Sequence, residues 1–150
     1  MAVPKPKEAV VKTTFPADQF VPTEWSTAED KARFANHFLR FVESGFAESL
    51  FPQWFYKRLS MTFGHIAHYD RGGFFGTFFA SAAGKVRFLR VTVHHSFHGD
   101  PKFTYSDVER AVAGAVRAGG YLEKYERLLA DEIETAERGE LARLKAKYDL

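Results

Sequence analysis

The chain has 150 residues, a formal net charge of +2 and 45% hydrophobic residues, enough apolar side chain to bury the core of one domain. It contains no cysteine, which excludes disulfides, cysteine zinc sites and thiol catalysis. No apolar run approaches the roughly 20 residues of a membrane helix, and the N-terminal residues lack the apolar segment of a secretory signal. We therefore expect a cytoplasmic protein without membrane contact.

The first 25 residues are marked by prolines, which fix the backbone and remove hydrogen-bond donors. We expect residues 1–25 to form a flexible or extended N-terminal arm, and residues 26–150 to form a single globular α+β domain. The spacing Ser26-Thr-Ala-Glu29 predicts a capping box and a helix over residues 27–47. Phenylalanines recur along one side of this helix, which places His37 on the opposite, solvated side.

A second helix is expected over residues 52–68, opened by a proline in its first turn. Its apolar residues recur at core spacing. A second stripe on the same helix combines Trp54, Arg58, His65 and His68, and the sequence leaves open which of the two stripes is buried.

Two strands are predicted next, over residues 74–80 and 86–97, after a turn at Asp70-Arg-Gly-Gly73. In the second strand, period-2 alternation places Arg90, His94 and His98 on the polar face. Together the strands predict a small antiparallel hairpin beside about four helices, which is an α+β fold.

The remainder of the chain reads as two helices. Ser106-Asp-Val-Glu109 matches a capping box, and Gly119-Gly120 marks the end of the helix that it opens. A long amphipathic helix then runs from about Tyr121 into the 140s. Gly139 lies where its apolar stripe changes phase, which indicates either a bend or a lost helical end. The stripe packs either on the body or on a second copy of the chain, which would form a homo-oligomer.

Residues 51–98 hold five of the six histidines and no glutamate, and their six cations stand against Asp70 alone. His65, His68 and Asp70 could share a metal ion if the His94, His95 and His98 cluster folded over them. No glutamate completes a HExxH helix, and the serines lack a nucleophile elbow. The phosphate-loop and dinucleotide patterns also fail, so enzyme activity is not the favoured interpretation and no cofactor is expected.

The favoured interpretation is a non-enzymatic binding module of adaptor or inhibitor type. It would engage an acidic partner because residues 51–98 are basic. The partner would be a protein because arginine and tryptophan are common interface anchors. The predicted binding residues are Trp54, Arg58, His65, His68, Arg71, Arg90, His94 and His98. One alternative is nucleic-acid binding by the same surface, since cations track phosphates while rings stack on bases. A second alternative is a metal-dependent enzyme using His65, His68 and Asp70.

Overall fold

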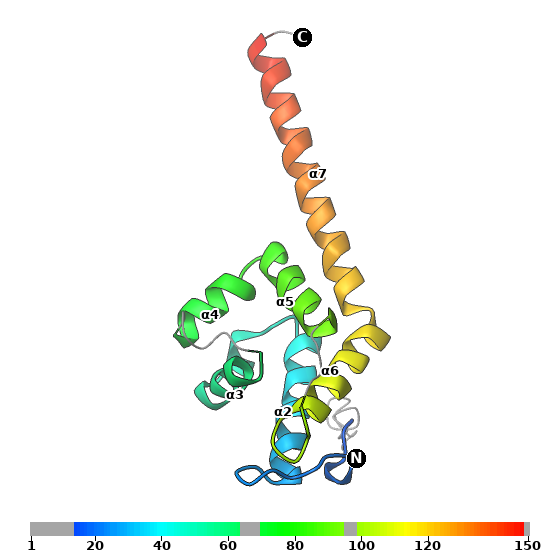
Figure 1. The fold of residues 1–150 in the computed structure, drawn as a ribbon. Coiled ribbons are helices and arrows are strands. Elements are labelled where there is room, and N and C mark those ends of the chain that lie inside the picture. The colour runs from blue at the N-terminus through cyan, green and yellow to red at the C-terminus, as the bar shows by residue number, and fades with distance from the viewer. Residues whose placement is uncertain (1–13, 64–69, 95–98, 149–150) are drawn as a thin grey trace, which may run out of the picture.

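The described residues of the computed structural model, 14–63, 70–94 and 99–148, are helical and contain no strand (Figure 1). The predicted α+β fold with its β-hairpin is therefore wrong. The elements in chain order are η1 (Ala17–Gln19), α2 (Ala28–Glu43), η2 (Glu48–Leu50), α3 (Gln53–Phe63), α4 (Arg71–Phe78), α5 (Ala82–His94), α6 (Ser106–Gly119) and α7 (Tyr121–Tyr148).

Both predicted strands are helices because local caps and helical burial override the strand-like composition. The Asp70 side chain accepts a hydrogen bond from the backbone N–H of Gly73 and so caps α4. The Ser81 hydroxyl does the same for Gly84 at the start of α5. In α5 the buried residues recur every three to four positions, as in Val86, Leu89 and Val93. Thr92, which alternation placed on a polar face, is fully buried as part of the same helical pattern.

The core lies among α2, α3, α4, α5 and α6 and consists largely of phenylalanine rings. Phe41 of α2 is at its centre, with ring centroids 4.8 Å from Phe79 and 5.4 Å from both Phe51 and Phe55. α2 packs against α6, and α5 packs against both α6 and α7. In Figure 1, α3 lies on one side of α2 and α6 on the other.

Helix α2 starts one residue later than the predicted capping box. Thr27 and Asp30 form the box, in place of Ser26 and Glu29, with each side chain bonded to the other residue's backbone N–H. The helix ends at Glu43. His37 is buried, against the prediction of a solvated position, because η2 and α3 cover that side of α2.

His37 acts as a packing residue between α2 and the segment that follows it. Its Nε2 lies 2.7 Å from the Leu50 carbonyl, and its ring contacts those of Trp54 and Phe55. An N–H on Nε2 donates to that carbonyl, and Nδ1 is left to face Arg40. Desolvation by burial is the main cause that lowers the pKa of His37, so the ring is neutral at pH 7.

Helix α7 begins on the body and then leaves it (Figure 1). Gly120, in the left-handed conformation with φ 66°, ends α6 and lets the chain reverse into α7. Tyr125 is buried on the body, whereas every residue of 131–148 is exposed except Leu144, which is half-buried. The helix continues through Gly139, so the helix does not end there.

Candidate functional site

An open cleft of about 580 Å³ lies between the segment before α2, helix α3, and the loop and first turn of α6. Its volume is in the range typical of ligand and peptide sites. We call it the Arg58 cleft. The segment before α2 contributes Thr23, Trp25 and Ser26, and α3 contributes Arg58, Met61 and Thr62. The other wall is formed by Phe103, Thr104, Tyr105 and Glu109.

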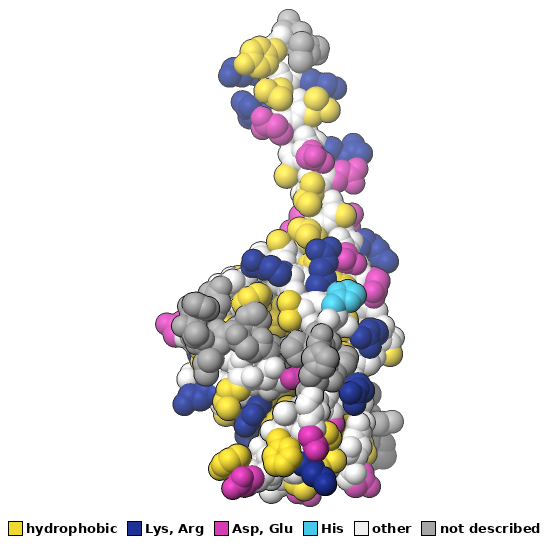
Figure 2. All heavy atoms as spheres, viewed as in Figure 1, with side chains coloured by type: hydrophobic (Ala, Val, Ile, Leu, Met, Phe, Trp, Pro, Cys, Tyr) yellow, Lys and Arg dark blue, Asp and Glu magenta, His cyan; other side chains and the backbone are white. Residues whose placement is uncertain are grey.

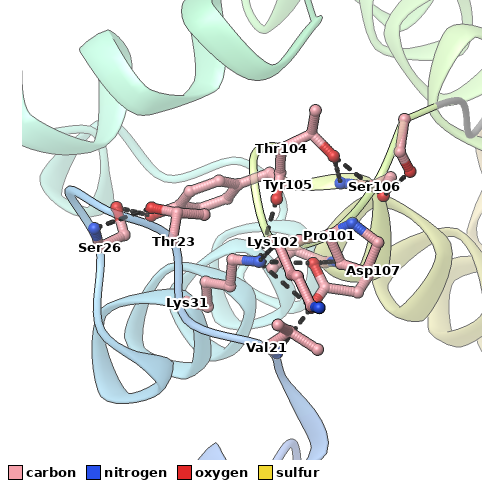
Figure 3. Close-up of polar contacts among 12 residues, drawn as sticks. Val21, Thr23, Ser26, Lys31, Pro101, Lys102, Thr104, Tyr105, Ser106 and Asp107 are labelled. Atoms are coloured by element: carbon pink, nitrogen blue, oxygen red, sulfur yellow. Dashed lines mark hydrogen bonds and ion pairs between the residues drawn. The ribbon is translucent and has the colours of Figure 1, made fainter.

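The wall of the cleft is held by Lys31 of α2, a lysine with no exposed surface (Figure 3). Its ammonium group donates to the carbonyls of Pro101 at 2.8 Å and Thr104 at 2.9 Å, and to the Asp107 carboxylate at 3.0 Å. Each of the three N–H groups of the ammonium therefore has an acceptor, and its buried positive charge is paired with the Asp107 carboxylate. This arrangement fixes the loop before α6 against α2.

Asp107 extends this network to the segment before α2. Its Oδ2 accepts a hydrogen bond from the backbone N–H of Val21 at 3.0 Å, across 86 positions of sequence. Close by, the Tyr105 hydroxyl donates to Ser26 at 2.8 Å, and the Ser26 N–H donates to the Thr23 hydroxyl. Figure 3 shows these contacts joining three separate segments. The two walls of the cleft are therefore held by buried polar contacts.

Large apolar side chains surround the mouth of the cleft. Seven such side chains are exposed in the part of the chain that the structure describes, and Trp25 (85%), Phe103 (78%) and Met61 (59%) are three of them. All three line this cleft, and the other four lie on α7. Exposed hydrophobic side chains gathered around a cleft are typical of binding surfaces.

Two groups give the cleft its charge. The Arg58 guanidinium lies over the ring of Tyr105, 4.2 Å from its centroid, which holds the cation against one wall. Glu109 lies at the floor and is 8% exposed. Desolvation by burial, followed by repulsion from Asp107, raises the pKa of Glu109 to about 7. Near neutral pH this carboxyl is therefore half protonated, and the positive charge of Arg58 is not cancelled by a full negative one.

The Thr62 hydroxyl adds a further polar group to the lining. It is buried and has no hydrogen-bond partner among the described residues. Buried hydroxyls usually have a hydrogen-bond partner, so this one is an unusual feature of the lining.

The other predicted binding residues that the structure describes do not gather at this cleft. Trp54 is half-buried, with the Arg33 guanidinium 4.0 Å from its ring centroid. Arg71 lies 3.8 Å from Glu48, and Arg90 forms an ion pair of 2.9 Å with Glu126 of α7. His94 is exposed at the end of α5. Glutamates from outside residues 51–98 therefore offset part of that segment's positive charge.

His65, His68 and His98 lie outside the described residues, as do His95 and the end of the predicted second strand. Asp70, the third member of the predicted metal site, caps α4. Within the described ranges, no three histidine, aspartate or glutamate side chains form a group that could hold a metal ion.

Most of this cleft is not indicated by the sequence alone. One signal was available, because Lys31 precedes Phe34 and Phe38 at helical spacing and so occupies a core position of α2. A charged residue at a core position predicts a buried ion pair. Trp25, Phe103 and Glu109 carried no comparable signal, since their proximity depends on how distant segments pack.

No known protein family, curated protein or solved structure was found to match this chain. Among the described helices, none is long and apolar enough to cross a membrane. The chemistry of the cleft therefore carries the functional argument: it offers one fixed cation, three exposed apolar side chains and hydroxyl groups.

Proposed function

We propose that this chain is a non-enzymatic binding module of the adaptor or inhibitor type, and that the Arg58 cleft binds an acidic segment of a partner protein. The observation that carries this proposal is the position of Arg58, a cation held among the exposed side chains of Trp25, Met61 and Phe103. A bound segment with one apolar side chain and a neighbouring carboxylate would satisfy both features. Tryptophan and arginine are the residue types most often found as interface anchors.

The charge of the cleft favours an anionic group. The guanidinium of Arg58 presents several donors in one plane, which suits a carboxylate. Protonation of Glu109 below its pKa of about 7 removes the opposing negative charge. Affinity for an acidic segment should therefore rise as the pH falls from 8 to 6, whereas a cationic ligand would show the opposite trend. Burial is the main cause that raises the pKa of Glu109, and Asp107, whose carboxylate is paired with Lys31, raises it further.

Protein recognition is favoured over the nucleic-acid alternative by the distribution of the cations. A nucleic-acid surface needs several cations along one track to neutralise successive phosphates. Arg71 and Arg90 lie near carboxylates, and Arg87 donates to the Thr77 carbonyl. Among the described residues, Arg58 is the predicted binding cation that lines the cleft.

Binding can be measured with labelled peptides that carry a leucine or phenylalanine flanked by aspartate and glutamate. Fluorescence anisotropy gives the affinity, and Trp25, at 85% exposure, supplies an intrinsic signal. We expect Arg58→Ala to weaken binding about tenfold or more, equivalent to about 1.4 kcal/mol. Phe103→Ala should weaken it as well. Lys57→Ala is the matched control, because Lys57 is an exposed cation next to Arg58 in α3 and does not line the cleft.

Two results would overturn the proposal. One is binding of single- or double-stranded nucleic acid that falls steeply with salt while no acidic peptide binds. The other is peptide binding that Arg58→Ala and Lys57→Ala reduce equally, since binding would then follow overall charge and not the cleft.

A further inference from the structure

The outer part of α7 presents a second surface, distinct from the Arg58 cleft. Residues 131–148, here called the free segment, span about 27 Å at 1.5 Å per residue and lead away from the body (Figures 1 and 2). On the side opposite the stripe described next, Asp131, Glu132, Thr135 and Ala136 still line a pocket with residues 80–85 of the body. Helices in proteins gain most of their stability from packing an amphipathic face. The free segment carries three of the seven exposed large hydrophobic side chains of the described residues.

These apolar side chains share one face of the helix. Ile133, Leu141 and Tyr148 are each more than half exposed, and Leu144 lies between the last two in sequence. At 100° per residue the four fall within an arc of about 80°. Ile133 and Leu144 are eleven residues apart, a spacing that keeps a stripe nearly straight along a helix. Glu137 lies at the middle of the same arc, so one partner helix would cover four apolar side chains and one carboxylate.

The charges of the free segment divide into two halves. Residues 131–140 contain five acids and one base, for a net charge of −4. Residues 141–148 contain Arg143, Lys145 and Lys147 and no acid, for a net charge of +3. Within the helix, Arg138 pairs with Glu134, and Arg143 pairs with Glu140. These pairs leave Asp131, Glu132, Glu137, Lys145 and Lys147 without an ion pair in the described part of the chain.

From this pattern we infer that the free segment binds the free segment of a second copy of the chain, with the two helices antiparallel. Antiparallel pairing places the basic half of each helix against the acidic half of the other. Parallel pairing would place like charges against each other, which is unfavourable. A two-fold axis makes the same surface complementary to itself, as in most homodimers.

The apolar stripe and the charges together define a register. A two-fold axis between Gly139 and Glu140 brings Glu134 level with the second copy's Lys145, on the same flank of the stripe. Ile133 then packs between the second copy's Leu144 and Tyr148. The axis lies midway along the free segment, so each tip reaches the place where the other helix leaves its own body.

The oligomeric state tests this inference directly. Sedimentation equilibrium of the full chain should give a mass twice the 17.1 kDa of one chain, with a dissociation constant that rises with salt. Leu144→Glu should raise that constant about tenfold or more. Its fold should persist, because Leu144 does not belong to the body. A monomer at the highest attainable concentration, with α7 helical by circular dichroism, would refute the inference.

Charge exchange separates the two orientations. Glu134→Lys should weaken the dimer, and Lys145→Glu should weaken it similarly, because both side chains lie on the same flank of the stripe. The variant carrying both changes should recover the affinity, because each new lysine faces a new glutamate. Failure of the double variant to recover would overturn the antiparallel register.

Cysteine cross-linking gives an independent readout, since the chain has no cysteine of its own. Glu140→Cys, near the axis and on the stripe side, should form a disulfide-linked dimer on mild oxidation. Gly139→Cys is the matched control, because residue 139 points away from the stripe and a Cβ there meets nothing within 4 Å. Tyr148→Cys should also fail to cross-link, since antiparallel pairing holds the two tips about 25 Å apart. Cross-linking of Tyr148→Cys as fast as Glu140→Cys would show a parallel pair and refute the inference.

Discussion

The replacement Lys31→Met tests whether the buried ammonium group holds the Arg58 cleft together. Methionine fills a similar volume, so loss of packing is small and the change is mainly electrostatic. The variant leaves the carbonyls of Pro101 and Thr104 without their donor, and leaves the Asp107 side chain, which is 14% exposed, without its cation.

The expected loss follows from these contacts. Removing one partner of a buried ion pair typically costs about 3–5 kcal/mol, because the remaining charge stays desolvated. Asp107 still accepts hydrogen bonds from the backbone N–H groups of Val21 and Val108, which places the loss toward the lower end of that range. A loss of about 3 kcal/mol is a large share of the 5–15 kcal/mol that stabilise a typical domain.

Urea unfolding monitored by far-UV circular dichroism measures this loss. Asp107→Asn is the companion variant, since it keeps one acceptor oxygen while removing the charge that Lys31 faces. The double variant should lose less than the sum of the two single losses, because both changes break the same pair. A loss below about 1 kcal/mol for Lys31→Met, or strict additivity, would refute the reasoning. Loss of peptide affinity in a still-folded Lys31→Met protein would tie the buried pair to the cleft.

Three further predictions concern titration and close packing. Burial raises the pKa of Glu109 to about 7 from the ordinary value of 4.5, so the folded chain holds a proton that the unfolded chain releases. The wild-type chain therefore loses stability as the pH rises from about 4.5 through 7, and Glu109→Gln should be more stable than wild type by about 3 kcal/mol at pH 8 but not at pH 4. Equal differences in urea midpoint at both pH values would contradict this. Burial lowers the pKa of His37 below its ordinary 6.5, so the unfolded chain takes up a proton first as the pH falls. His37→Gln, whose amide can still donate to the Leu50 carbonyl, should lose less stability than wild type between pH 7 and 5, and an unchanged pH slope would count against it. In Gly84→Ala a Cβ would meet the Thr77 carbonyl oxygen at 2.6 Å and that of Phe78 at 2.9 Å, so thermal unfolding should show a loss of about 1–3 kcal/mol. Gly114→Ala, with nothing within 4 Å of its Cβ, is the helical control and should gain up to about 1 kcal/mol; equal effects at the two glycines would contradict the close approach.

The sequence alone located several helix boundaries, because capping and glycine signals act over a few residues. It placed a capping box within one residue of its true position at Thr27 and Asp30. It also placed the start of α6 at Ser106 and its end at Gly119-Gly120. At Ser106 the predicted capping box is nevertheless absent, because the serine hydroxyl donates to the Gly99 carbonyl.

The choice between helix and strand for residues 71–94 was decided by tertiary packing. Glycine, phenylalanine and valine in this segment favour a strand by composition, but such preferences are weak beside burial. In Val86–Val93 the residue pattern fits both periods, since alternate positions and positions three to four apart are apolar. α5 is covered by α4, α6 and α7, and that environment selects the helix.

The candidate site also depended on tertiary structure. Arg58 was predicted as a binding residue, but the side chains that surround it come from segments up to 86 positions apart. His37 was assigned to solvent because a helical wheel does not show what packs against its polar side. Charge and apolar spacing along α7 are properties of the sequence itself. They already indicated that the apolar stripe of this helix packs either on the body or on a second copy of the chain. What packing decided is which part of that helix remains uncovered: the body covers Tyr125 and leaves 131–148 exposed, because α5 and α6 do not extend that far.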